Sequence, residues 1–128
     1  MRFLLDTHFL LWTAEGSDRL PNEFIKLVED DTNELVFSVA SIWEVAIKVR
    51  RRRPNFEITA ALLRRFLLDN GFDELLVTGE HAAAVENLPG IHADPFDRLL
   101  VAQAFCEGLV LLTADRTVAK YGGPVRLM

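Results

Sequence analysis

Cysteine is almost absent from this sequence. Cys106 is the only one among 128 residues, which excludes an internal disulfide and a zinc site built from several cysteines. It lies in an apolar stretch, so we expect a small buried side chain rather than a reactive thiol. A chain that needs no disulfide suits a reducing compartment, and we expect a cytoplasmic protein.

Long apolar runs are also lacking. No stretch reaches the roughly 18 consecutive apolar residues that span a membrane, and the first residues, MRFLLD, lack the apolar run and cleavage site of a secretory signal. We therefore expect no membrane association. Half of the residues are nevertheless apolar (50%), which is enough for a core in one domain over residues 1–128.

Positive charge is scarce as well. The chain has 14 Lys and Arg against 19 Asp and Glu, a net charge of −5, which taken alone disfavours binding to a polyanion. The distribution changes this interpretation, because Lys48 and the run Arg50–Arg53 concentrate cations in one segment. An acidic metal site can coexist with a basic strip of this kind.

Short apolar runs alternate with segments of helical character. The runs that predict strands are Phe3–Leu5, Leu35–Ser38, Leu75–Val77, Val110–Thr113 and Val125–Leu127. The first and fourth are unbroken apolar runs, which is typical of strands buried on both faces of a parallel sheet. The segments that predict helices are Asn22–Asp30, Ser41–Arg52, Thr59–Asp69, Glu80–Asn87 and Pro95–Glu107. This alternation predicts an α/β fold with a mainly parallel sheet flanked by helices.

Acidic residues recur near the carboxyl ends of the predicted strands. Asp6 directly follows the first strand, Asp115 follows the fourth, and Glu44 lies in the helix after the second. Asp94 and Asp97 begin the last long helix. In an open α/β sheet the binding crevice lies outside the carboxyl ends of the strands. We therefore expect these carboxylates to converge on one crevice.

Carboxylates that converge in a partly dry crevice repel one another. A hard divalent cation relieves this repulsion, and Mg²⁺ is bound in proteins by one or two carboxylates together with waters and substrate phosphates. No set of His and Cys ligands favours zinc instead. A carboxylate-bound Mg²⁺ or Mn²⁺ suits hydrolysis of a phosphodiester, because the metal activates water and stabilises developing charge.

Each acidic residue also has a structural alternative. Asp6 and Asp115 each precede a helix and could serve only as N-caps. Glu44 could be a solvated residue paired with Lys48 one helical turn later. These alternatives stay open, because each residue by itself gives a weak signal.

Asp94 has the strongest structural alternative. It precedes Pro95, which suits the first position of a helix, so Asp94 would be the N-cap and Asp97 its partner at the third position. Asp97 can cap the helix and still point its carboxylate into the crevice. His8 and His92 lie near the acids in the sequence, and we expect structural or supporting roles for them.

The motifs around the acids resemble the PIN-domain family, specifically the VapC-type toxin branch. The matching segments are LLDTHFLLW at 4–12, SVASIWEVAIK at 38–48, DPFDRLLVAQA at 94–104, GL at 108–109 and LTAD at 112–115. The segment beginning at Asp94 is the most specific, and the order and spacing agree over essentially the whole chain. The resemblance implies a PIN-like fold with a five-stranded parallel sheet.

The resemblance also implies an activity. It implies RNA cleavage that depends on Mg²⁺ or Mn²⁺ and leaves a 5′-phosphate and a 3′-hydroxyl. It further implies a homodimer and a small cognate antitoxin that blocks the acidic pocket, often with a basic side chain. The implied catalytic and metal-binding acids are Asp6, Glu44, Asp97 and Asp115; Asp94 is a secondary candidate, and Thr113 occupies the place of a polar residue that supports the site.

Basic residues near the acids are candidates for RNA contacts. Arg50, Arg51 and Arg52 extend the helix that carries Glu44 and could bind phosphates. They could equally form a solvated helix end, where cations suit the helix dipole. Arg98 could contact the substrate or form a local ion pair. The sequence does not separate these alternatives.

Two other functions remain to be considered. A haloacid-dehalogenase-like phosphatase needs a second Asp two residues after the first, and His8 stands there. A receiver domain needs an acidic pair at the first strand and a Lys after the last, and neither is evident. The other alternative is a non-catalytic PIN-like scaffold that binds RNA or protein. Its signature would be the loss of one or more of the acids, and all of them are present.

Overall fold

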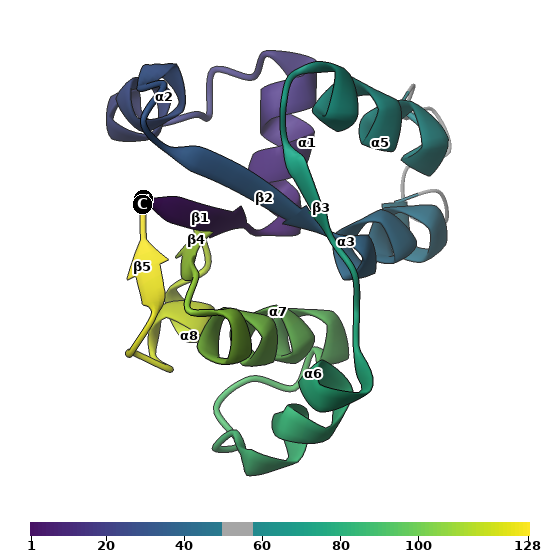
Figure 1. Ribbon diagram of the computed structural model, residues 1–128, viewed down its shortest axis with the longest axis vertical. Coiled ribbons are helices and arrows are strands. Elements are labelled where there is room, and N and C mark those ends of the chain that lie inside the picture. The colour runs from purple at the N-terminus through teal and green to yellow at the C-terminus, as the bar shows by residue number, and fades with distance from the viewer. Residues whose placement is uncertain (50–57) are drawn as a thin grey trace.

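A five-stranded sheet forms the centre of the molecule. The computed structural model describes residues 1–49 and 58–128. The strands lie in the order β3-β2-β1-β4-β5 (Figure 1), and each neighbouring pair is parallel. The strands are β1 (Arg2–Leu5), β2 (Glu34–Ser38), β3 (Asp73–Leu75), β4 (Val110–Thr113) and β5 (Val125–Leu127). This confirms the predicted α/β fold with a parallel five-stranded sheet.

Helices cover both faces of this sheet. Figure 1 shows α1, α2 and α5 on one side of it and α6, α7 and α8 on the other. The helices are α1 (Thr7–Glu15), α2 (Asn22–Glu29), α3 (Val39–Glu44), the π-helical turn η1 (Val45–Val49), α5 (Ala60–Asp69), α6 (Gly79–Ala84), the 3₁₀ turn η2 (Val85–Asn87), α7 (Pro95–Glu107) and α8 (Arg116–Ala119). Among the described residues, no helix is long and apolar enough to cross a membrane.

The unbroken apolar strands supply both halves of the core. Phe3 and Leu5 of β1 belong to the cluster that includes Phe9 and Phe24, whose rings stack at 4.6 Å. Leu4, between them, faces the other way and packs in the cluster with Val101 of α7. Alternate residues of a strand point to opposite faces, so an apolar run without polar interruptions serves both layers. Each fully buried side chain of this size contributes roughly 1.5–3 kcal/mol.

The third strand differs from its prediction. It was expected at Leu75–Val77 and lies at Asp73–Leu75, which makes that prediction wrong by two residues. The strand forms an edge of the sheet, where polar side chains can face solvent. Leu76 and Val77, on which the prediction depended, lie beyond the strand and are 64% and 38% exposed.

The helix expected at Ser41–Arg52 is not one regular α-helix. It begins earlier, at Val39, and continues from Glu44 as the π-helical turn η1. The candidates Arg50, Arg51 and Arg52, and Arg53 with them, lie outside the described residues. Cys106, expected to be buried, is half-buried on α7.

The strand order determines where the site lies. From β1 the chain moves outward to β2 and β3, then returns to place β4 and β5 on the other side of β1. The reversal occurs between β1 and β4, and ligands of open α/β sheets bind at such a switch point, outside the carboxyl ends of the strands. Asp6 follows β1, and Asp115 follows β4 by one residue.

Candidate active site

Asp6 is the most deeply buried acid of the crevice. Its Oδ1 caps α1 by accepting a hydrogen bond from the amide of Phe9 at 2.9 Å. Its Oδ2 accepts hydrogen bonds from the hydroxyl of Thr113 at 2.7 Å and the amide of Ala114 at 3.2 Å. Burial raises the pKa of this carboxyl despite these three donors. A buried carboxylate of this kind gains strongly from a nearby cation.

Asp115 lies opposite, at the end of β4. Its Oδ1 caps α8 by accepting hydrogen bonds from the amides of Thr117 at 2.7 Å and Val118 at 3.3 Å. Partial burial acts to raise its pKa, but these amides together with His92 outweigh that effect and lower it. Thr113 links the two acids, since its hydroxyl donates to Asp6 and accepts from the amide of Asp115 at 3.0 Å.

Glu44 and Asp94 share a lysine. Glu44 accepts a hydrogen bond of 2.6 Å from the hydroxyl of Thr7, the residue after Asp6. Lys48 pairs with Glu44 at 3.4 Å and also contacts the carboxylate of Asp94 directly. The predicted Glu44–Lys48 pair is therefore present, and the same lysine reaches a second acid. Partial burial acts to lower the pKa of Lys48, but its two carboxylate partners raise it.

Asp94 also caps α7, as predicted. Its Oδ1 accepts hydrogen bonds from the amides of Phe96 at 2.8 Å and Asp97 at 3.2 Å. Burial acts to raise its pKa, but Lys48 and these amides lower it. Asp94 is therefore a well-compensated anion at the edge of the site.

Asp97 is the least compensated acid of the group. It lies in the first turn of α7, half-buried, with 22% of its side chain exposed. Burial, together with the negative charges of Asp94, Glu44 and Asp6, raises its pKa from 3.8 to about 6, and His92 partly offsets this. The effect of these charges indicates that Asp97 lies near acids of three separate parts of the fold, the start of α7, α3 and the end of β1.

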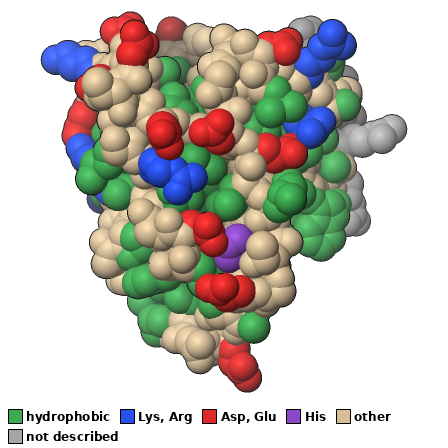
Figure 2. Space-filling view, in the orientation of Figure 1, with side chains coloured by type: hydrophobic (Ala, Val, Ile, Leu, Met, Phe, Trp, Pro, Cys, Tyr) green, Lys and Arg blue, Asp and Glu red, His purple; other side chains and the backbone are tan. Residues whose placement is uncertain are grey.

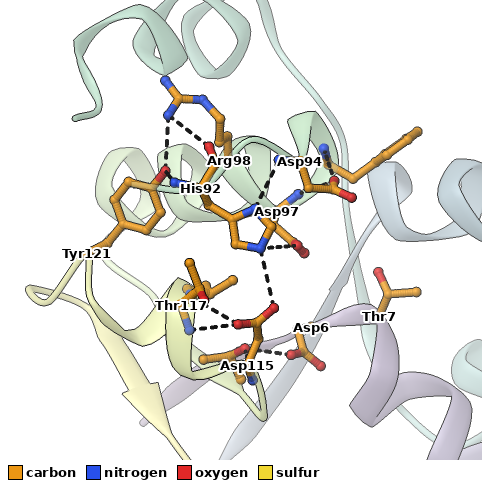
Figure 3. Close-up of polar contacts among 12 residues, drawn as sticks. Asp6, Thr7, His92, Asp94, Asp97, Arg98, Asp115, Thr117 and Tyr121 are labelled. Atoms are coloured by element: carbon orange, nitrogen blue, oxygen red, sulfur yellow. Dashed lines mark hydrogen bonds and ion pairs between the residues drawn. The ribbon is translucent and has the colours of Figure 1, made fainter. Parts of the chain in front are cut away.

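His92 lies between two of the acids. Its Nε2 is 3.3 Å from Oδ2 of Asp115 and 3.4 Å from Oδ2 of Asp97 (Figure 3). Its Nδ1 accepts a hydrogen bond of 2.9 Å from the amide of Asp94. From the sequence we expected only a structural or supporting role for His92, because this backbone contact and the distant Asp115 cannot be predicted from spacing.

Arg98 is committed to the protein itself. Its guanidinium donates hydrogen bonds to the carbonyls of Val85 at 3.1 Å and Pro89 at 3.0 Å, and to the hydroxyl of Tyr121 at 3.0 Å. Its described partners are carbonyls and a phenol rather than a carboxylate, so the expected local ion pair is not formed among the described residues. Its contact with RNA stays a prediction.

A family model describing the PIN domain matches residues 3–124 of this chain. The chain belongs to the PIN-domain family. PIN domains are nucleases, which agrees with a crevice of acids at the switch point. A comparison with curated protein sequences gave no match.

Several solved structures share the fold of this PIN domain. VapBC2 from Rickettsia felis, bound to a promoter DNA fragment, is 17% identical with a TM-score of 0.72, covering 100% of this chain and 98% of that one. DNA-bound VapBC from Salmonella typhimurium is 16% identical with a TM-score of 0.66, covering 100% and 97%. FitAcB from Neisseria gonorrhoeae is 18% identical with a TM-score of 0.61, covering 98% and 96%. At these identities the likeness establishes the fold.

The donors of this PIN domain fit a hard divalent cation. The charges of Glu44 and Asp6 act on Asp97, and two of the candidate acids, Asp6 and Asp97, have raised pKa values that a cation would relieve. Ligand-capable atoms of His92, Asp97 and Asp115 all lie within 4.8 Å of one another. The roles of these acids as ligands remain predictions.

A pocket adjoins the acids on the side of α1. It has a volume of about 300 Å³, opens to solvent, and is lined by His8, Trp12, Arg19, Ala114 and Asp115. The Arg19 guanidinium lies 5.9 Å from the centre of the Trp12 ring. The sequence did not single out Arg19, because it is separated from the acids along the chain and belongs to no motif. The pocket therefore has the ring of Trp12 and the guanidinium of Arg19 in the same lining as Asp115.

One face of the PIN domain is mixed in charge. On this face acidic side chains lie among apolar ones and a few Lys and Arg side chains (Figure 2). Trp43 is 59% exposed and packs edge-on against Phe96 at 5.1 Å. It is therefore outside the core of the single chain.

Proposed function

We propose that this chain is a Mg²⁺- or Mn²⁺-dependent endoribonuclease, the toxin of a type II toxin–antitoxin module. The observation that carries the proposal is the position of Asp97, whose pKa is raised to about 6 by burial and by the charges of Asp94, Glu44 and Asp6. A cluster that raises the pKa of its own members costs stability. Such clusters are found mainly at functional sites. Membership in a nuclease family supports the same conclusion.

The four acids would hold the metal, and their neighbours keep them in place. When bound, the metal would supply Lewis-acid stabilisation of the phosphate and activation of a water molecule. Thr113 fixes Asp6 and the backbone of Asp115, while Thr7 fixes Glu44. These hydrogen bonds orient the carboxylates before the cation arrives, which reduces the reorganisation that binding requires.

The RNA would cross the pocket beside Asp115. Arg19 and His8 offer cationic or hydrogen-bonding groups to a phosphate, and Trp12 offers an aromatic wall to a base. Arg50, Arg51 and Arg52 stay proposed phosphate contacts on chemical grounds. A single strand that enters from the pocket would bring one phosphate next to Asp115 and Asp97.

The proposed partners are a small antitoxin and a second copy of the chain. The similar structures include VapBC complexes and a toxin–antitoxin complex from Klebsiella pneumoniae. The exposed Trp43 and its neighbour Phe96 offer an aromatic surface beside Lys48. An antitoxin that places a basic side chain in the acidic crevice would compensate the same charges as the metal.

The test is cleavage of RNA by the purified chain with Mg²⁺ or Mn²⁺, against the Asp6→Asn variant. We expect cleavage to fall by at least 100-fold in the variant and to stop when EDTA is added. Asp69→Asn is the matched control, because it removes the same charge from a side chain that is 71% exposed on α5. Full activity in Asp6→Asn would refute the assignment. Metal binding without cleavage by the wild type would favour a non-catalytic scaffold.

A further inference from the structure

We propose that His92 is a positioning residue for the acids of the crevice and not a metal ligand. Its Nε2 donates a hydrogen bond to the carboxylate of Asp115 and lies 3.4 Å from that of Asp97, and in this way it holds the two acids at a fixed separation. This inference rests on the proposed metal-dependent function. The alternative is that His92 itself binds the metal, because His92, Asp97 and Asp115 together have the composition and spacing of a metal site.

The hydrogen bonds of the ring decide between these roles. The amide of Asp94 donates to Nδ1 of His92 at 2.9 Å, so Nδ1 must present a lone pair. A neutral imidazole carries its proton on the other nitrogen, which places the N–H on Nε2. Nε2 faces Asp115 and Asp97 (Figure 3). A nitrogen that carries a proton cannot bind a metal, but it can donate to a carboxylate.

The backbone of His92 is anchored as firmly as its ring. Its amide donates to the hydroxyl of Tyr121 at 3.0 Å, and the same hydroxyl accepts from Arg98 at 3.0 Å. The guanidinium of Arg98 also lies within 3.4 Å of the carbonyl of His92. These contacts fix the segment that leads into α7, so the direction of the ring is determined by the fold rather than by a bound ion.

The position of His92 joins two separately held acids. Asp97 belongs to α7, whereas Asp115 follows β4. Within residues 1–49 and 58–128, His92 is the side chain that contacts both carboxylates. Each carboxylate oxygen has more than one lone-pair direction, so a donor on one side leaves another direction for the cation. Hydrogen bonds of this kind to metal ligands typically change metal affinity by about 10- to 100-fold.

The first experiment follows the ring directly. Nitrogen-15 NMR of the imidazole at about pH 8 should show the proton on Nε2 without metal. Saturating Mg²⁺ should leave it there. A proton that moves to Nδ1 when Mg²⁺ binds would overturn the proposal, because Nε2 would then be a ligand. This readout does not depend on RNA cleavage.

The second experiment compares metal affinities by calorimetry. His92→Ala should weaken Mg²⁺ and Mn²⁺ binding by about 10- to 100-fold and to the same extent. His92→Gln should restore most of the affinity, because its amide can place an N–H near the position of Nε2. A loss much larger for Mn²⁺ than for Mg²⁺, without rescue by Gln, would identify a nitrogen ligand instead, and unchanged affinity in His92→Ala would also overturn the proposal.

Tyr121→Phe is a second variant, for use if His92→Ala fails to fold. It removes the hydroxyl that anchors His92, and we expect a smaller loss of metal affinity because the ring is still present. Unchanged affinity in Tyr121→Phe, with His92→Ala unfolded, would count against positioning. If the wild type cleaves RNA and His92→Ala binds metal normally, only the proposal for His92 is refuted. If the wild type binds no metal, the proposed function is refuted as well.

Discussion

Neutralising Asp97 should stabilise the metal-free protein at neutral pH. The carboxyl lies among Asp94, Glu44 and Asp6, and burial together with these charges raises its pKa from 3.8 to about 6. At neutral pH it is charged and disfavoured by its surroundings. Asp97→Asn keeps the shape of the side chain and removes that charge. We therefore expect a variant that is more stable than the wild type and inactive as an enzyme.

The magnitude follows from the pKa. A rise from 3.8 to about 6 corresponds to roughly 3 kcal/mol, because each tenfold change is 1.36 kcal/mol. The side chain of Asp97 is 22% exposed, so solvent screens part of this repulsion, and the lost contact with His92 offsets some more. We expect a net gain of about 1–2 kcal/mol in the free energy of unfolding.

The pH dependence gives the sign of the effect. Because the folded-state pKa of Asp97 is raised, its contribution to stability is complete below about pH 4 and is lost as the pH rises through about 6. The Asn side chain does not titrate. Urea denaturation in EDTA should therefore show Asp97→Asn more stable than the wild type at about pH 7.5 and nearly equal to it at about pH 3.5.

Asp94→Asn is the matched control from the same helix end. The pKa of Asp94 is lowered in the folded protein, despite partial burial, by Lys48 and two backbone amides. Its charge contributes stability above its unfolded pKa that is lost as the pH falls through its folded pKa. Asp94→Asn should therefore be less stable than the wild type at neutral pH. Equal destabilisation by Asp97→Asn and Asp94→Asn would refute the reasoning about like-charge repulsion.

Two other variants test the parts of the site that hold the acids and the substrate. Thr113→Val removes the hydroxyl that donates to Asp6 and leaves a buried carboxylate short of a donor, so urea denaturation should show a loss of about 1–3 kcal/mol; an unchanged midpoint would contradict this. Arg19→Gln should raise KM for RNA several-fold with kcat unchanged and a weaker dependence on salt, whereas unchanged KM would exclude the pocket as an RNA site.

The strands and the places of the acids along them could be predicted from the sequence, because local patterns indicate buried strands and helix ends. The strand that ends at Thr113 and the helix that begins at Pro95 have the bounds that were predicted. Buried strands must be apolar on both faces, and a helix that starts with Asp-Pro and ends with Gly has clear ends. The edge strand β3 escaped prediction because an exposed edge needs no such pattern.

The connections between the acids were not accessible in the same way. Lys48 was expected to pair with Glu44 one turn away, and it does. Its second partner, Asp94, is 46 residues further along the chain, and no local rule relates the two. The contact between His92 and Asp115 spans 23 residues and depends on how α7 packs beside β4. Sequence spacing identified the acids, whereas tertiary packing determined which groups compensate them.

The negative charges of the acids are not equally compensated by neighbouring donors and basic side chains. This difference indicates which of the acids a cation would stabilise most. Asp94 and Asp115 each accept two backbone amides and contact a basic side chain, and their pKa values are lowered. Asp6 and Asp97 have raised pKa values, the first because it is buried and the second because it is also surrounded by like charges. A cation must displace a proton from Asp97 below about pH 6, so metal affinity should weaken as the medium becomes more acidic. Under the proposed function, a cation would therefore stabilise Asp6 and Asp97 most, since Asp94 and Asp115 are already compensated by amides and a basic side chain.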